Sequence, residues 1–137
     1  MKKININILI SIIIVMIFCT TFSICNSEVI TLETGEKLIY PDLNSDIYGI
    51  RVNGVTLCDS DAFIDILKKD LIPLYKEATG EKITSLTCSF VKGRKEKNSL
   101  IWSEEWIVRS DTDIKYYLMD FTFKPSGGTC FKITLIK

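Results

Sequence analysis

The sequence predicts an α+β fold in which one main helix packs on a four-stranded antiparallel meander sheet, with short strands before the helix. Two observations carry this prediction. Apolar residues recur at helical spacing between Ala62 and Ala78, and four segments after Gly80 have the alternation of strands. Short turns separate these four segments, which favours antiparallel neighbours in the sheet.

The first 25 residues have the pattern of a secretory signal. Lys2 and Lys3 precede an apolar run over residues 8–18, and a small polar stretch follows over residues 19–21. The run is short for a bilayer span, which needs about 20 apolar residues. An uncleaved anchor over residues 4–24 is the alternative. We therefore expect a signal peptide over residues 1–25, a single domain over residues 26–137, and a periplasmic or secreted location.

Residues 59–79 have the clearest helical pattern. Asp59, Ser60 and Asp61 supply N-cap candidates and acidic residues for the first turn, and Gly80 is placed to end the helix. Pro73 lies inside the pattern, so a kink or a break into two helices is expected there.

Strands are expected on both sides of this helix. Before it, the candidates are residues 29–32, 38–40 and 47–57, and the last contains Asn53-Gly54, a strong two-residue hairpin signal. After it, we expect strands over residues 83–91, 100–109, 114–124 and 129–136. The order of elements resembles the cystatin-like and NTF2-like layouts over about residues 59–136. It carries no motif, and such folds host many unrelated functions.

Composition excludes several chemistries. The chain has 17 basic and 17 acidic residues, so removing Lys2 and Lys3 leaves 15 against 17 and no strong field for nucleic acid. It contains no histidine, which excludes a Ser-His-Asp or Cys-His nucleophile within the chain. The basic run over residues 92–97 is interpreted as a solvated hairpin tip. We expect a protein that is not an enzyme and has no cofactor.

Trp102, Glu104 and Trp106 form the most informative local pattern, because residues two apart share one face of a strand. A carboxylate between two indoles in a cleft would have a raised pKa and could act as a general acid. Glycosidase chemistry would also need a second carboxylate, for which Asp120 is the candidate. Two structural interpretations compete: a bulge at residues 103–105 that turns the glutamates outward, or tryptophans that contact a partner at the surface.

Residues 42–46 have the spacing Asp-x-Asn-x-Asp of a calcium loop. The pattern then fails, because Ile47 occupies the position that needs Gly and Asn53 the position that needs Glu. We predict a turn rich in Asp and Asn, and no metal site.

The cysteines predict a disulfide if the chain is exported. Cys19 leaves with the signal, and Cys25 stays only if cleavage comes before it. Cys58 precedes the helix and Cys88 shares a face with the core, whereas the alternation of Cys130 points away from it. Direction therefore favours Cys58 with Cys88, and level along the sheet favours Cys58 with Cys130.

Taken together, the sequence predicts a small exported protein that acts by binding another protein, as an inhibitor or an immunity-type protein. The contact residues proposed are Trp102, Trp106, Tyr116, and Asp61 with Asp65 on an acidic helix side. One alternative is an envelope assembly or structural subunit that contacts the membrane through an uncleaved N-terminal segment. The other is a carboxylate-dependent hydrolase that uses Glu104.

Overall fold

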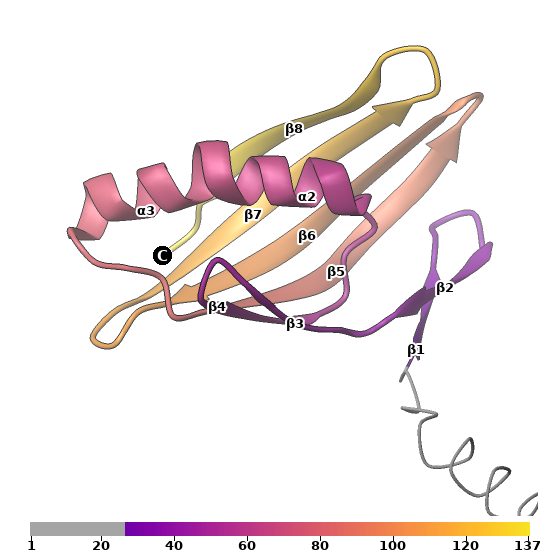
Figure 1. Ribbon diagram of the computed structural model, residues 1–137. Helices are drawn as coiled ribbons and strands as arrows, with labels where there is room; N and C mark the ends of the chain where they lie inside the picture. Colours follow the sequence, from indigo (N-terminus) through magenta and orange to yellow (C-terminus); the bar gives the residue numbers. More distant parts are fainter. Residues whose placement is uncertain (1–26) are drawn as a thin grey trace, which may run out of the picture.

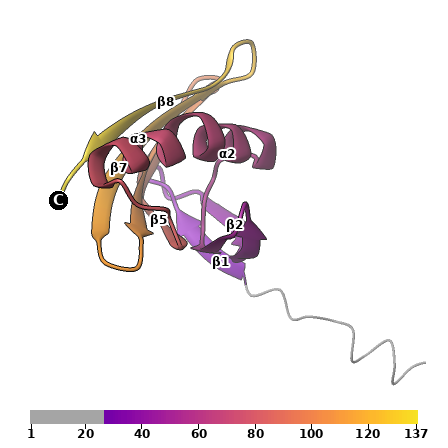
Figure 2. The same ribbon diagram turned by 60° about the vertical axis from the view of Figure 1, so that its left-hand side comes forward.

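The computed structural model describes residues 27–137, in which a single long helix lies across one face of a six-stranded sheet (Figure 1). A separate two-stranded hairpin stands beside the sheet, near the start of the helix (Figure 2). The predicted signal peptide, its anchor alternative, Cys19 and Cys25 lie outside the described residues.

Short strands precede the helix in the sequence, and long strands follow it. The sheet strands lie in the order β3-β4-β5-β6-β7-β8, and β1 pairs with β2. Their bounds are β1 Ser27–Thr31, β2 Lys37–Pro41, β3 Leu43–Ile47, β4 Ile50–Gly54, α2 Ser60–Ile66, η1 Leu67–Leu71, α3 Ile72–Thr79, β5 Ser85–Glu96, β6 Ser99–Arg109, β7 Ile114–Lys124 and β8 Gly128–Leu135.

The predicted four-stranded meander is wrong, because the sheet has six strands and is mixed. The ladders from β5 to β8 are antiparallel, but β4 pairs parallel to β5 across the helical crossover, and β3 pairs with β4 as a hairpin. Burial explains why β4 joins the sheet: Ile50 and Val52 point into the core and are 3% and 0% exposed. A strand of five residues carries only two such positions, too few for alternation to mark it as part of the main sheet.

The prediction that Asn53-Gly54 forms a hairpin turn is wrong. The β3–β4 hairpin turns at Tyr48-Gly49, both with positive φ, and Ile47 pairs with Ile50 across it. Asn53-Gly54 instead ends β4. A Cβ on Gly54 would lie 2.0 Å from the carbonyl oxygen of Cys88, so glycine is required here by the close approach of β4 to β5.

The helix is continuous from Ser60 to Thr79, and the expected break at Pro73 does not occur. Asp59 is the N-cap, and its side chain accepts a hydrogen bond from the amide of Ala62 at 3.0 Å. Gly80 ends the helix in the left-handed conformation. A π-helical turn over Leu67–Leu71 precedes Pro73. Such a wide turn is one of the ways in which a helix accommodates a proline that lacks an amide hydrogen.

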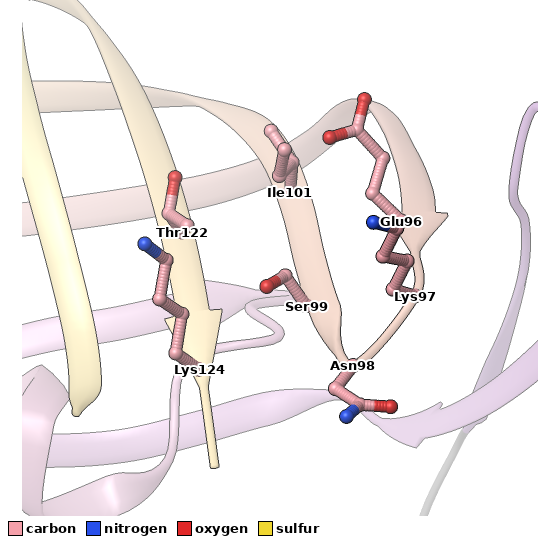
Figure 3. Close-up of a pocket in the computed structure, with 7 residues that line it drawn as sticks. All are labelled: Glu96, Lys97, Asn98, Ser99, Ile101, Thr122 and Lys124. Atoms are coloured by element: carbon pink, nitrogen blue, oxygen red, sulfur yellow. The ribbon is translucent and has the colours of Figure 1, made fainter. Parts of the chain in front are cut away.

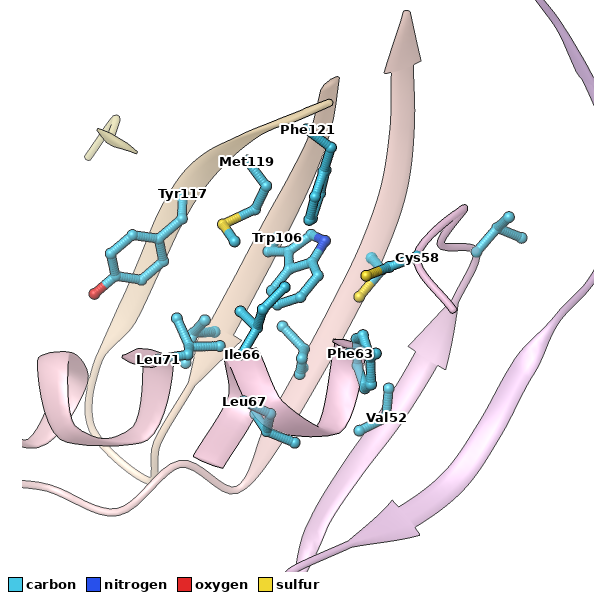
Figure 4. Packing of buried hydrophobic residues seen from close by; sticks show 14 of the residues in the cluster. Val52, Cys58, Phe63, Ile66, Leu67, Leu71, Trp106, Tyr117, Met119 and Phe121 are labelled. Carbon is cyan, nitrogen blue, oxygen red and sulfur yellow. The ribbon is translucent and has the colours of Figure 1, made fainter. Parts of the chain in front are cut away.

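The core lies between the helix and the inner face of the sheet (Figure 4). Tyr75 of the helix and Trp106 of β6 are both 0% exposed, and the rings of Phe63 and Trp106 are 5.2 Å apart. Beyond the start of the helix, Leu32 covers the inner face of the sheet. It is 2% exposed and lies against Gly93. Other buried residues of the helix and of β7 complete this layer: Ile66, Leu67, Leu71, Tyr117, Met119 and Phe121.

Candidate functional site

Glu104 lies at the centre of the inner face of the sheet and is 0% exposed. Its Oε1 accepts hydrogen bonds from the indole nitrogen of Trp102 at 2.8 Å, the hydroxyl of Thr56 at 2.9 Å and the amide of Leu57 at 2.8 Å. Its Oε2 accepts one from the indole nitrogen of Trp106 at 2.7 Å. All four neighbours donate, a set that suits an ionised carboxylate.

The carboxylate of Glu104 is enclosed by protein groups on the inner face of the sheet. Burial raises the pKa of its carboxyl above the ordinary value, and the four donated hydrogen bonds oppose that rise without cancelling it. The raised pKa agrees with the sequence prediction, but the buried carboxyl does not line a cleft through which a substrate could reach it. The side chain of Glu104 does not reach the surface, and both of its carboxylate oxygens already accept hydrogen bonds from protein donors. Glu104 therefore cannot serve as the general acid of a hydrolase in this conformation.

Asp120 lies on the opposite face of the sheet from Glu104. It pairs with Ser103 across β6 and β7, and the hydroxyl of Ser103 donates to its carboxylate at 2.6 Å. Because Ser103 and Glu104 are consecutive on a strand, their side chains point to opposite faces. The two carboxylates cannot act on one bond, so the predicted catalytic pair is wrong.

Trp102 and Trp106 share the inner face with Glu104, as the alternation predicted. They are 2% and 0% exposed, and Trp102 stacks on Phe121 with ring centroids 4.8 Å apart. Neither indole can contact a partner, so the surface interpretation of these residues is wrong. The expected bulge at residues 103–105 is absent as well. The irregularity lies on the facing strand, between Phe90 and Lys92, and β6 stays regular.

The network explains how the segment before the helix is held. Thr56, Leu57 and Cys58 are buried at 8%, 7% and 7% exposure, and the amide of Cys58 donates to the hydroxyl of Thr56 at 3.1 Å. Glu104 thus fixes the connection between β4 and α2 onto β6. Sequence reasoning missed Thr56 and Leu57, because nothing in the chain signals a hydrogen bond across 47 residues.

Residues 42–46 do not form the predicted turn; Leu43–Ile47 is strand β3. Side chains two residues apart on a strand share one face but are spaced about 6–7 Å apart along a line, so their oxygens do not converge around one ion. Over residues 27–137, no group of three or more acidic or sulfur-bearing side chains is arranged to hold a metal.

The proposed surface contacts on the helix are exposed. Asp61 lies in the first turn, and Asp65 forms an ion pair with Lys69 at 2.8 Å, so the acidic side is partly neutralised. Tyr116 is half-buried on the outer face of the sheet, and the ammonium of Lys137 lies 4.5 Å from its ring centroid. These three residues do not share a surface, because the helix and the outer face lie on opposite sides of the sheet.

The three described cysteines are free thiols, two in the core and one at the surface. Cys58 and Cys88 are 7% and 1% exposed. Cys130 is exposed and lies opposite Thr122 on the outer face. No disulfide joins any two of the cysteines among residues 27–137, so both predicted pairings stay predictions.

A surface depression lies at the β5–β6 tip (Figure 3). Lys97 and Asn98 make the turn, and Ser99, Ile101, Thr122 and Lys124 lie on the strands beside it. Glu96, the remaining residue of its wall, is paired with Arg94 at 2.7 Å. All three charged residues are exposed, and no buried polar group points into the depression, so nothing here defines a ligand.

Strand β8 forms an open edge of the sheet. It pairs with β7 only, and no other strand among residues 27–137 lies against it (Figure 1). The amide of Ile136 donates to the carbonyl of Tyr116, which fixes the phase of the ladder. Since bonded and non-bonded pairs alternate in an antiparallel ladder, the amides of Phe131, Ile133 and Leu135 point away from β7.

Comparison with protein-family models, with curated proteins and with solved structures finds no match to this chain. Within residues 27–137, the helix lacks the combination of length and apolar character that crossing a bilayer requires.

Proposed function

We propose that the protein is an exported binding protein that contacts a partner protein by strand addition at the edge of β8. The observation that carries this proposal is the open edge itself. Eight residues, Gly128–Leu135, extend without proline or bulge, and three successive outward amides are available for a new ladder. An added strand gains main-chain hydrogen bonds, and side chains at alternate positions decide which strand is accepted.

The side chains of β8 favour an extended acidic segment as the partner. Lys132 is exposed in the middle of the strand and Lys137 lies just beyond its end. A lysine in an edge strand opposes uncontrolled pairing with apolar strands. The same lysine would form an ion pair with an acidic residue of an added strand, because opposite charges on neighbouring strands attract. An inhibitor or immunity-type protein could act in this way on its target.

The location half of the proposal is tested on the native chain. Peptide mass spectrometry of the protein from cell envelope and culture medium should find a new N-terminus close to residue 25. Retention of Lys2 and Lys3 on membrane-bound protein would favour the anchored envelope subunit instead. Intact protein confined to the cytoplasm would contradict export altogether.

The binding half is tested with a matched pair of variants at Leu135, which is 54% exposed and has an outward amide. Leu135→Pro removes that amide, whereas Leu135→Ala removes the side chain and keeps it. We expect that one protein captured from the same compartment binds the wild type and Leu135→Ala equally well. The amount of this protein captured by Leu135→Pro should be at least tenfold lower. Equal capture by both variants, with both folded by circular dichroism, would contradict strand addition at β8.

A further inference from the structure

We infer that Cys58 and Cys88 are the sites of an intramolecular disulfide, which locks the segment before the helix onto β5. The inference rests on the proposed export only for where the bond forms in the cell. The geometric basis of the inference does not depend on where the protein is located in the cell. It is the path of the chain from the end of β4 to the helix.

The chain passes Cys88 just before it reaches Cys58. Gly54 pairs with Cys88 across β4 and β5, and the amide of Val55 donates to the carbonyl of Cys88 at 2.9 Å. Three residues later, the amide of Cys58 folds back to the hydroxyl of Thr56. Leu57, the residue before Cys58, is held on Glu104 of β6, the strand next to β5, and both cysteines belong to one buried cluster.

The surroundings of both thiols disfavour their thiolate forms. Burial, the carboxylate of Glu104 and the Cys58 sulfur together raise the pKa of Cys88 well above its ordinary value. Burial, Glu104 and Asp59 raise the pKa of Cys58 to about 12. Against an ordinary thiol pKa of 9.0, this lowers the reactive thiolate fraction of Cys58 roughly a thousandfold.

The bond therefore forms while the chain is still unfolded or folding. A cysteine thiolate attacks a small-molecule or protein disulfide and releases one thiolate of that oxidant. The second cysteine thiolate then attacks the mixed disulfide and releases the other. The two cysteines together lose two protons and two electrons, and the oxidant is reduced to two thiols. Once folded, the buried pair is protected from further exchange.

The test uses the unfolded full chain, refolded with oxidised and reduced glutathione, then quenched, alkylated in denaturant and digested. We expect a peptide linking Cys58 to Cys88 and an alkylated Cys130, while the folded reduced protein in the same buffer oxidises at least a hundredfold more slowly. Alkylation of both Cys58 and Cys88 after refolding, or a link from either to Cys130, would overturn the inference.

Stability gives a second readout. Oxidation of the wild type should raise its Tm by about 10 °C or more, because the bond closes a loop of 30 residues (58 to 88) in the unfolded chain. Cys130→Ser should show the same rise, whereas Cys58→Ala with Cys88→Ala should show none. An unchanged wild-type Tm would count against the bond. Since this test needs no cell, a linked pair in vitro with reduced cytoplasmic protein in vivo would refute export alone.

Discussion

Glu104 is a buried carboxylate whose partners are all donors, and this makes it the residue on which local stability depends most. It connects two indoles of its own strand with Thr56 and Leu57 of the segment before the helix. Buried polar groups contribute little when they are satisfied and cost much when one partner is lost. The effect of a substitution should therefore exceed what the loss of a single hydrogen bond would give.

Glu104→Gln should lower the free energy of unfolding by about 2–4 kcal/mol at neutral pH. The carboxamide keeps the shape but points its own N–H groups at one of the four donors. The matched control is Glu105→Gln, one residue along and half-buried on the outer face, which should change stability by no more than about 0.5 kcal/mol. Urea unfolding followed by tryptophan fluorescence measures both, and equal effects would refute the role assigned to Glu104.

The raised pKa of Glu104 makes its contribution depend on pH. A folded-state pKa above the unfolded one means that the folded protein binds the proton more tightly. The stabilisation from Glu104 should be fully present below the unfolded pKa, near 4.5, and should be lost as the pH rises through the folded pKa. The stability difference between wild type and Glu104→Gln should thus grow on acidification. If this stability difference shrinks on acidification, the hydrogen-bond donors lower the pKa of Glu104 by more than burial raises it.

At the scale of elements, the close contact of β4 with β5 depends on one backbone position. Gly54 has a φ of +90°, and Cys88 lies where its Cβ would be. Gly35 has a similar φ of +84° but nothing within 4 Å of a Cβ. The two glycines therefore separate the cost of steric overlap from the cost of the left-handed conformation.

Gly35→Ala should cost about 1–2 kcal/mol, the price of a left-handed alanine. Gly54→Ala should cost at least about 2 kcal/mol more, because the strands must also separate. Denaturant unfolding of the two variants measures the difference. Similar losses would mean that β4 can move away from β5 without harm.

The same region shows what the sequence could and could not predict. The helix ends follow from local chemistry, so Asp59 and Gly80 were identified correctly. The shared face of Trp102, Glu104 and Trp106 follows from strand alternation and was also predicted. Whether Tyr48-Gly49 or Asn53-Gly54 forms the hairpin turn depends on the contact of Gly54 with Cys88. Cys88 is distant in the sequence, so local patterns do not reveal this contact. The donors to Glu104 were missed for the same reason.

At the scale of the whole molecule, the helix and the β1–β2 hairpin share the task of covering one face of the sheet. Trp106 lies under the helix, against Phe63, and Trp102 lies beside Gly93, which Leu32 covers. The rings of both tryptophans lie close to the ring of Phe121, so the residues under the helix and those under the hairpin form one core. The domain should behave as one cooperative unit.

Unfolding in urea should therefore give a single transition, with coincident midpoints by tryptophan fluorescence and far-ultraviolet circular dichroism. Two separated transitions would show that the hairpin and the helix stabilise independent parts. The measurement should be made on oxidised and on fully reduced protein, since cooperativity is expected in both.

The parallel pairing of β4 with β5 has a consequence for the order in which the chain acquires its shape. Ladders from β5 to β8 join neighbours in sequence and can close by short hairpins, whereas β4 must wait for the crossover to be compacted. Synthesis proceeds from the N-terminus, so Ile50 and Val52 emerge long before the strand that will shield them. Nascent chains of this protein will thus carry an unprotected apolar hairpin until residues 85–96 arrive, which is the interval when chaperones have most to bind.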